Sequence, residues 1–420
     1  MVPVKMRARF ISLGLITLTL YALIGRSMAA EHKITFAANP SSAKQQEVYH
    51  LLAQRFEALN PDISVIVSSQ SLEAHKQRVQ DFYNGKTNNI DVMLAYAGTQ
   101  LQQLIDSGNI QPLNTLWEEY ELDQRFSQSI KQLVSKQKIP FAIPMAYYQW
   151  GIYYHKSLFE RLELAIPTNW AEFITLIKTL KENDITPLNF SGGSTWSSLA
   201  WFDYLSLRIL GKDKYLALVK GKLPFTTPEV KEVFSHWHQL IQAGAFDRDH
   251  RAMTWSEILP FFYRRKMAMM LNGNFFLAHV PEHVRKDVGF FPFPKVRENM
   301  HRYESAPTDV AVLNANSDNL PAAKKFIAFL ASLEAQTLVA NYVGKIAPHV
   351  NYQPTNRYLL NEGKAHLEGA NGLVQYFDRE ANEQFTAAAG TLFIDFMCEK
   401  LTVDSLIEQL EIARKQKLLE

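Results

Sequence analysis

Cysteine is almost absent from this chain of 420 residues, because Cys398 is the only one. A single cysteine permits no disulfide within the chain, so the fold must be held by its hydrophobic core. Hydrophobic residues make up 47% of the sequence and charged residues 20%, which is typical of a globular protein, and the chain is too long for one ordinary domain. We therefore expect two packed lobes.

An excess of one charge sign is also lacking, since 44 basic residues stand against 42 acidic ones. Lys5, Arg7, Arg9 and Arg26 lie in an N-terminal segment that has the layout of an export signal, and without them 40 basic residues remain and the formal charge changes from +2 to −2. A chain so nearly neutral offers no broad basic surface. We therefore expect no nucleic-acid partner.

Enzyme signatures are missing from the sequence. It contains no Gly-x-Ser-x-Gly elbow, no His-Glu-x-x-His motif and no Gly-x-Gly-x-x-Gly after a strand. Glu118 and Glu119 are adjacent, so they do not form the facing carboxylate pair that a glycosidase needs. His236 and His238 lie two residues apart on a predicted helix and point to different sides, which disfavours a shared metal ion. We expect no catalytic residue, no metal and no cofactor.

Residues 1–29 predict a cleaved signal peptide. Three basic residues precede an apolar run at 10–25, and Ser27 and Ala29 then flank a cleavage point. The run is about 16 residues long and a spanning helix needs about 20, which favours cleavage over an uncleaved signal anchor. No cysteine follows the run, so a lipid-anchored N-terminus is not expected. The mature chain should begin near Ala30 and be free in the periplasm.

After the leader the chain alternates between strands and helices. Strands are predicted at 34–38, 63–67 and 90–96, and helices at 48–59, 72–83 and 98–108. This order predicts an α/β fold with a largely parallel sheet, in which ligands bind beyond the carboxyl ends of the strands. Asn39, Ser41 and Tyr96 lie in loops at those ends and are candidate ligand-binding residues.

Four segments follow in order along the chain: the leader with "ITFAANPSSAKQQEVYHLLAQRFEALNPDISVIV", then "IPMAYYQWGIYYHKSLFERLELAIPTNWAEF", "FFYRRKMAMMLNGNFF" and "DNLPAAKKFIAFLASLEAQTLVANYVGKIAP". Together they resemble the extracellular solute-binding proteins of ABC importers, in the carbohydrate-binding group that includes maltose-binding protein. The resemblance implies the two-lobed periplasmic binding protein fold (type II), each lobe a mainly parallel sheet flanked by helices, with ligand between the lobes. It places the N-terminal lobe at 30–146 and 306–350, and the C-terminal lobe at 147–305 and 351–420.

Three departures from the family's pattern bear on the ligand geometry around Thr308 and Asp309. Arg265 stands where the family commonly has glycine before the Ala-Met strand. The sequence "APTDVAVLN" stands where the family often has Gly-Gly, and Phe275 replaces a tryptophan at the turn.

The stretch "AYYQWGIYY" matches the family's first crossing between the lobes. If it is extended, Tyr148, Trp150 and Tyr154 share one face while Tyr153 lies on the other. We expect Tyr148 and Trp150 to face the ligand and Tyr153 and Tyr154 to pack in the core. The alternative is that all these rings are ordinary strand formers.

Other candidates come from three loops. Trp196 follows the Gly-rich loop "NFSGGST", which lacks the lysine of a phosphate-binding loop, and we expect its ring to face the ligand rather than the core. Asn274 and Phe275 follow a predicted strand, where a plain Asn-Gly turn is the alternative. Asp309, at the second crossing, is a candidate acceptor for a hydroxyl. Two further rings could line either the site or the core: Trp201 and Trp255.

Aromatic rings beside Asn, Asp and Gln suit a sugar, because its C–H face packs on a ring while its hydroxyls need hydrogen-bond partners. The sequence therefore predicts a monomeric periplasmic component of an ABC importer that captures a sugar or oligosaccharide and delivers it to inner-membrane permease subunits. Two alternatives stay open: the same fold with a polyamine, iron or small anion as ligand, and an exported carbohydrate-active enzyme.

Overall fold

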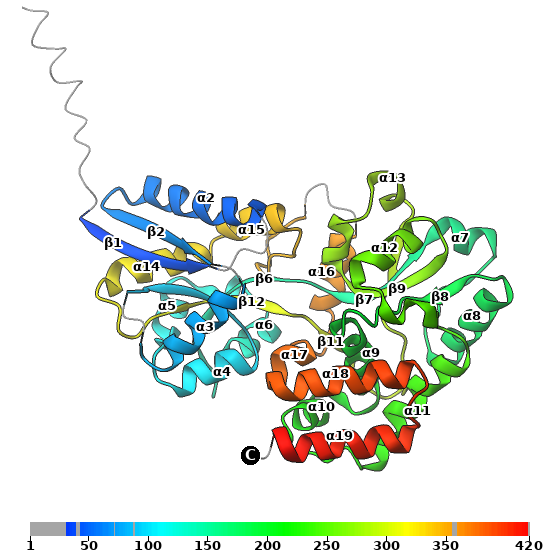
Figure 1. Ribbon diagram of the computed structural model, residues 1–420. Helices are drawn as coiled ribbons and strands as arrows, with labels where there is room; N and C mark the ends of the chain where they lie inside the picture. The colour runs from blue at the N-terminus through cyan, green and yellow to red at the C-terminus, as the bar shows by residue number, and fades with distance from the viewer. Residues whose placement is uncertain (1–30, 39–42, 71, 87–88, 355–358, 419–420) are drawn as a thin grey trace, which may run out of the picture.

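The computed structural model describes residues 31–38, 43–70, 72–86, 89–354 and 359–418 (Figure 1). The predicted signal peptide, Asn39 and Ser41 lie outside these residues. Two lobes stand side by side, each built on its own sheet and its own cluster of buried hydrophobic side chains. The two-lobed α/β fold expected from the sequence is therefore confirmed.

The N-terminal lobe is built on a five-stranded sheet in the order β2-β1-β3-β12-β6. Its strands are β1 (His32–Ala38), β2 (Ile63–Ser69), β3 (Val92–Tyr96), β6 (Ala142–Tyr147) and β12 (Thr308–Leu313). Strand β1 pairs in parallel with β2 and β3, whereas β12 runs antiparallel to β3 and β6. The helices of this lobe are α2 (Ala43–Leu59), α3 (Leu72–Tyr83), α4 (Thr99–Asp106), α5 (Asn114–Glu119), α6 (Gln128–Leu133), α14 (Leu320–Leu330) and α15 (Leu333–Val343).

The C-terminal lobe has a four-stranded sheet in the order β10-β7-β9-β8. Its strands are β7 (Trp150–His155), β8 (Thr186–Leu188), β9 (Met267–Gly273) and β10 (Val288–Phe291). Strand β7 is antiparallel to both β9 and β10, and β8 with β9 is the parallel pair. Strands β8, β9 and β10 therefore run in one direction and β7 alone runs in the other, so the sheet is mixed where a mainly parallel one was expected. The reason is that β7 arrives directly from β6 of the other lobe and not through a crossover helix.

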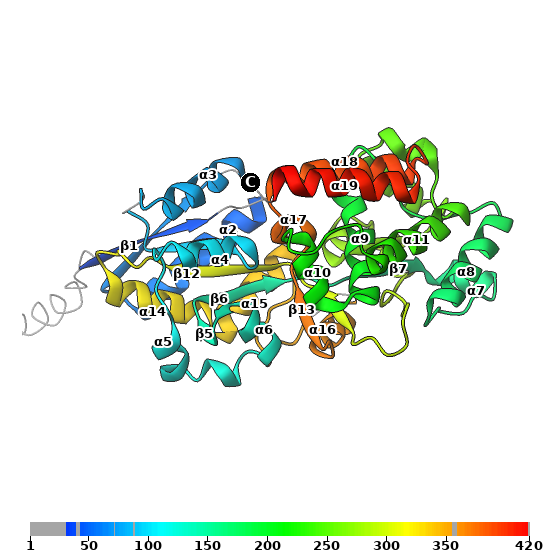
Figure 2. The same cartoon turned by 90° about the horizontal axis from the view of Figure 1, so that it is seen from below.

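Helices cover the C-terminal sheet and extend beyond it (Figure 2). They are α7 (Lys156–Arg161), α8 (Trp170–Glu182), α9 (Trp196–Ile209), α10 (Gly211–Val219), α11 (Pro228–Gln242), α12 (Trp255–Tyr263), α13 (Glu282–Arg285), α17 (Phe377–Glu380), α18 (Glu383–Met397) and α19 (Val403–Lys417). Helix α9 is buried on every side from Ser197 to Ile209. A helix with no solvent face lies in the centre of a large core, and α9 has this place in the C-terminal lobe.

The lobes are joined where chain segments pass between the two sheets. Strand β6 continues through Tyr148 and Gln149 into β7, as expected for the first crossing (Figure 1). The second crossing joins β11 (Tyr303–Ser305), which pairs with β13 (Gly372–Val374), to β12. Helix α16 (Leu360–Glu368) packs Leu360 and Leu367 into the N-terminal core. Residues after 350 thus contribute to both cores, and the exact division of the chain into lobes stays a proposal.

Candidate functional site

Six aromatic side chains gather in the C-terminal lobe near the crossings, and we call them the aromatic cluster. Three of them stand at the start of an element: Trp150 is the first residue of β7, Trp196 of α9 and Trp255 of α12. The other three rings lie close to the end or the start of an element. Rings from distant segments of the chain therefore meet at one place. The complete cluster is Tyr148, Trp150, Trp196, Trp255, Phe275 and Tyr376.

Three half-buried rings of this cluster form a triangle. The ring centroids of Trp196 and Trp255 are 5.8 Å apart, those of Trp255 and Phe275 5.8 Å, and those of Trp196 and Phe275 6.0 Å. Tyr148 packs edge-on against Phe275 at 5.4 Å and is also half-buried. The structure thus brings together Tyr148, Trp196 and Phe275, which the sequence analysis proposed separately, and Trp255, which the sequence left undecided between site and core.

The expectation that Trp150 presents an exposed ring was wrong. Its side chain is only 2% exposed, because Tyr376 stacks on it with the centroids 4.7 Å apart and the planes at 15°. Tyr153 is buried as expected, and Tyr154 is half-buried and packs against the C-terminal core. Trp201, which the sequence left undecided, is a core residue between Phe246 and Phe293.

Asn274 does not offer a free amide as the sequence suggested. Its side chain is 1% exposed, and its amide nitrogen donates to the carbonyl oxygen of Gly344, 3.2 Å away in the loop after α15. Its backbone N–H donates to the carbonyl oxygen of Gln149 in the first crossing. Asn274 therefore joins the two lobes, and its side-chain oxygen has no hydrogen-bond partner among the described residues.

Charged side chains lie beside the aromatic cluster, and we call Tyr96, Asp309, Lys345 and Arg379 the charged cluster. Strand pairing explains the first contact, because β12 places Asp309 directly opposite Tyr96 at the end of β3. Lys345 forms an ion pair with one oxygen of Asp309, and Nη1 of Arg379 lies 3.5 Å from the other. The guanidinium lies 4.1 Å from the ring centroid of Tyr96, and Lys345 lies 5.4 Å from that of Tyr148.

The protonation states of this region follow from burial. Burial raises the pKa of Tyr148 above its usual value, with further contributions from nearby Asp309 and Asp378, and Arg379 opposes this shift. The pKa of Arg379 is raised, because Tyr148, Asp309 and Tyr96 outweigh the effect of its burial. Tyr148 is therefore a neutral phenol and Arg379 a cation at any physiological pH.

Residues 375–380, which the sequence analysis did not single out, connect the two lobes. Gln375 accepts a hydrogen bond from the backbone N–H of Thr308 (2.8 Å) and donates to the carbonyl oxygen of Ala306 (3.1 Å), both in the second crossing. Thr99 of the N-terminal lobe donates to the carbonyl oxygen of Glu380 (2.6 Å). The segment is too short to show periodicity. Its one available signal was composition, since "QYFDRE" combines aromatic, amide and charged groups like the rest of the site.

Gly98 allows this segment to approach the N-terminal lobe. Its backbone angles are φ 92° and ψ −143°, which favour glycine. A Cβ there would lie 2.9 Å from Cγ of Gln375 and 3.0 Å from the carbonyl oxygen of Arg379. Both the backbone and the space at this contact between the lobes therefore require glycine.

We expect Gly98→Ala to lower the free energy of unfolding by about 2 kcal/mol, because strain and crowding act together. Gly108→Ala is the control: Gly108 has φ 74° and nothing within 4 Å of the added Cβ, so strain alone should cost about 1 kcal/mol. Urea denaturation gives both values. Equal losses would mean that the contact with Gln375 and Arg379 does not matter.

Several buried polar atoms at the lobe junction have no hydrogen-bond partner among the described residues. Two are the indole nitrogens of Trp150 and Trp255. Oδ1 of Asp309 and Nη1 of Arg379 face each other at 3.5 Å without forming a hydrogen bond. Gln149, Asn272 and Asn274 each add one side-chain atom. Such atoms are rare in folded proteins and call for a partner, so the junction has the donors and acceptors to bind a polar molecule.

A cavity elsewhere in the described part of the chain is less suited to a ligand. It lies on the C-terminal lobe, has a volume of about 490 Å³ and is lined by Trp170, His236 and Gln239 among others. Trp170 is almost fully buried there, and its indole N–H already donates to Gln239 at 2.8 Å. The junction is therefore the better candidate site.

Two lobes joined by chain crossings, with rings and charged groups at the junction, define a two-lobed solute receptor. The chain matches the family of bacterial extracellular solute-binding proteins over residues 39–337 and belongs to that family. Among the described residues, no helix combines the length and apolar character needed to cross a membrane.

Relatives and solved structures agree with this assignment. The chain is 23% identical over 333 residues to an ABC transporter extracellular-binding protein of Pyrococcus horikoshii, covering 76% of this chain and 73% of the relative. It is also 23% identical over 353 residues to the multiple sugar-binding protein of Streptococcus mutans, covering 77% of this chain and 78% of the relative. The structure of the bacterial solute receptor AcbH, described as preferring β-D-galactopyranose, superposes with a TM-score of 0.85 at 22% identity over 92% of this chain and 100% of AcbH. RafE of Streptococcus pneumoniae gives 0.78 at 16% identity, over 93% of this chain and 99% of RafE.

Proposed function

We propose that the protein is the substrate-binding component of an ABC importer and captures a neutral sugar or oligosaccharide at the lobe junction. The observation that carries this proposal is the triangle of half-buried rings beside a charged cluster in which Nη1 of Arg379 and Oδ1 of Asp309 form no hydrogen bond. Relatives named as sugar-binding proteins support it.

The chemistry of a sugar suits both parts of the junction. The C–H face of a pyranose packs on aromatic rings, which the triangle of Trp196, Trp255 and Phe275 supplies. A hydroxyl both accepts and donates hydrogen bonds. A hydroxyl lying beside Nη1 of Arg379 and Oδ1 of Asp309 would accept from the first and donate to the second, since these two atoms are 3.5 Å apart and form no hydrogen bond with each other.

The charges at the junction favour a neutral ligand over a polyamine or an anion. The cations Lys345 and Arg379 are balanced by Asp309 and Asp378, which lies close enough to affect the pKa of Tyr148. A polyamine would need an excess of carboxylates and an anion an excess of cations. The described residues supply neither excess.

Iron is disfavoured because the tyrosines of the first crossing diverge. Tyr147 packs in the N-terminal core, Tyr153 in a separate cluster with Phe276, and Tyr148 lies beside Phe275. Within the described ranges, no group of three or more His, Cys, Asp and Glu side chains could hold a metal ion.

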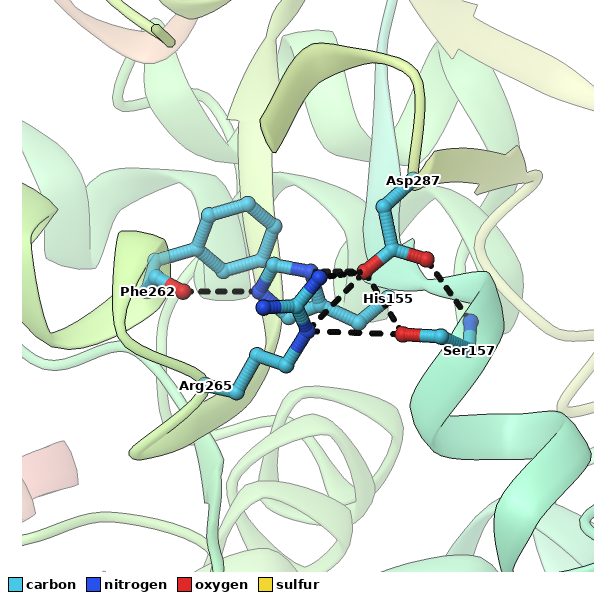
Figure 3. Close-up of polar contacts among 5 residues, drawn as sticks. All are labelled: His155, Ser157, Phe262, Arg265 and Asp287. Carbon is cyan, nitrogen blue, oxygen red and sulfur yellow. Dashed lines mark hydrogen bonds and ion pairs between the residues drawn. The ribbon is translucent and has the colours of Figure 1, made fainter. Parts of the chain in front are cut away.

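A serine, histidine and aspartate do meet in the C-terminal lobe, but their geometry is not that of a catalytic triad (Figure 3). Ser157 donates to Asp287 and not to His155, while Nε2 of His155 points at the carbonyl oxygen of Phe262, 2.7 Å away. Arg265, at φ 56° where the family commonly has glycine, bonds the same Asp287 at 2.8 Å. The hydrogen bonds among these side chains link separate segments of the C-terminal lobe, a structural role that supports a binding protein over an enzyme.

The proposed ligand-binding residues are the half-buried members of the aromatic cluster, the charged cluster and two loop residues expected from the sequence: Asn39, Ser41, Tyr96, Tyr148, Trp196, Trp255, Phe275, Asp309, Lys345 and Arg379. Export through a cleaved signal peptide, a periplasmic location, a monomeric state and delivery to an inner-membrane permease complete the proposal. The proposed lobes keep the limits 30–146 with 306–350 and 147–305 with 351–420.

A thermal-shift screen tests this function. We expect at least one of D-galactose, xylobiose, chitobiose and stachyose to raise the melting temperature of the mature protein, because a ligand at 100 times its Kd stabilises the folded state by about 2.7 kcal/mol. Spermidine, ferric citrate and phosphate should give no shift. Stabilisation by one of these three and by no sugar would overturn the proposal.

A further inference from the structure

We propose that Asp203, far inside the C-terminal lobe, is a positioning residue that holds residues 375–380 in place for ligand binding. This inference rests on the proposed function. It assigns a role to a residue that belongs to neither the aromatic cluster nor the charged cluster. Asp203 is a buried carboxylate, and both of its oxygens accept hydrogen bonds.

Asp203 is buried in the middle of α9, and none of the ion pairs among the described residues involves it. One carboxylate oxygen accepts from the hydroxyl of Tyr215 at 2.8 Å, and the other accepts from the backbone N–H of Phe377 at 3.0 Å. Burial raises the pKa of Asp203 well above its usual range, and the nearby Asp378 and Glu380 add to this effect. A carboxyl group in such a place destabilises the fold unless its hydrogen bonds offset the loss of solvation.

The bond to Phe377 lies in the middle of the segment that supplies the site. Tyr376, one residue before, stacks on Trp150 and donates from its hydroxyl to the carbonyl oxygen of Trp196. Arg379, two residues after, lies over Tyr96 and faces Asp309. Fixing one backbone N–H therefore fixes both a ring of the aromatic cluster and a cation of the charged cluster.

The same helix carries Trp196. Trp196 and Asp203 are seven residues apart, which puts them on one face of α9 about two turns from each other. Through Asp203, α9 sets the distance between its own first ring and the guanidinium of Arg379. A change of a few tenths of an ångström there alters the fit of a ligand that contacts both.

Substitutions at two positions separate positioning from general stability. Asp203→Ala removes the acceptor for the Phe377 N–H and also leaves the Tyr215 hydroxyl unpartnered. Tyr215→Phe removes only the bond to the hydroxyl and keeps the one to Phe377. Asp203→Asn should preserve both, since its oxygen can accept from Phe377 and its amide can donate to the Tyr215 oxygen. Asp203→Ser, with a shorter side chain, replaces Asp203→Ala if that variant does not fold.

The first measurement is amide hydrogen exchange of the peptide spanning 374–381 in the protein without ligand. We expect Asp203→Ala to speed exchange of this peptide at least about tenfold, and Tyr215→Phe and Asp203→Asn to change it less than about threefold. Exchange in Asp203→Ala within about threefold of the parent would overturn the proposal.

The second measurement is calorimetric titration with whichever of D-galactose, xylobiose, chitobiose and stachyose stabilises the parent most, well below the melting temperature of every variant. We expect Asp203→Ala to lose at least about tenfold in affinity, with Tyr215→Phe and Asp203→Asn within about threefold. Equal losses in Asp203→Ala and Tyr215→Phe would reduce Asp203 to a structural role. If no sugar binds the parent, the proposed function fails, and the exchange measurement still decides whether Asp203 holds the segment.

Discussion

Glu304→Gln is expected to lower the free energy of unfolding by about 3 kcal/mol or more, because it leaves a buried cation without its partner. Glu304 is 0% exposed at the start of the second crossing. Its carboxylate accepts from Nη2 of Arg208 at 2.7 Å and lies 3.1 Å from Nε2 of His366, with Arg302 at 3.7 Å. Arg208 and His366 are themselves buried, so water cannot replace the lost charge.

Glu298→Gln is the matched control, because it makes the same chemical change at the surface. Glu298 lies 4.0 Å from Lys295, and both side chains are more than half exposed. Pairs of this kind contribute at most about 1 kcal/mol. Chemical denaturation of the two variants and the parent gives the comparison. If Glu304→Gln lost no more than Glu298→Gln, the buried network would not hold the second crossing.

The stability of the protein should also depend on pH through Glu304. Burial alone would raise the pKa of this carboxyl group, but Arg208, His366 and Arg302 overcome that effect and lower the pKa from its usual 4.5 to about 2. A group whose pKa is lower in the folded state stabilises the fold above its unfolded pKa. This contribution should be complete above about pH 4.5 and should disappear as the pH falls toward 2. The difference in stability between the parent and Glu304→Gln should therefore shrink over that range.

Trp196→Ala is expected to weaken sugar binding about thirtyfold, the effect of losing an aromatic anchor worth about 2 kcal/mol. The ring of Trp196 is half-buried and belongs to the triangle with Trp255 and Phe275. Because part of the ring is open, its removal should change the melting temperature without ligand only slightly. Calorimetric titration with the sugar that responds best in the thermal-shift screen, and a melting curve without it, give both quantities.

Trp201→Ala is the contrasting variant on the same helix. Trp201 is 1% exposed and packs against Phe246 and Phe293. Its loss should reduce the free energy of unfolding by about 3 to 5 kcal/mol. An affinity of Trp196→Ala within about threefold of the parent would remove Trp196 from the site, whatever its melting curve showed.

Local patterns predicted the elements of the N-terminal lobe well. The predicted helix at 72–83 has the same limits as α3, and the predicted strands at 34–38, 63–67 and 90–96 overlap β1, β2 and β3. The predicted alternation of side chains between two faces of the first crossing was also confirmed, since Trp150 and Ile152 belong to one core cluster and Tyr153 to another. These features depend on the period of apolar residues, which a sequence displays directly.

Contacts between distant segments could not be predicted in the same way. The burial of Trp150 depends on Tyr376, which lies in the short segment at 375–380. The ion pair of Asp309 depends on Lys345, which follows α15. Neither partner has a periodic or motif signal of its own, and one sequence does not show which of many aromatic or basic residues comes near. The candidate rings could be named in advance, whereas their partners required the fold.

Tolerance to amino-acid substitution differs sharply along helix α9. Its first residue, Trp196, is half open, whereas every residue from Ser197 to Ile209 is enclosed. Near its far end Arg208 binds Glu304, about 18 Å from Trp196 at the rise of an α-helix. With Trp196 in the proposed site, new ligand preferences are expected to evolve, or to be selected in a library, by replacing the first residue of the helix and leaving the remainder unchanged. A duplicated copy of this chain would diverge in specificity at that end while the rest of the helix kept one sequence.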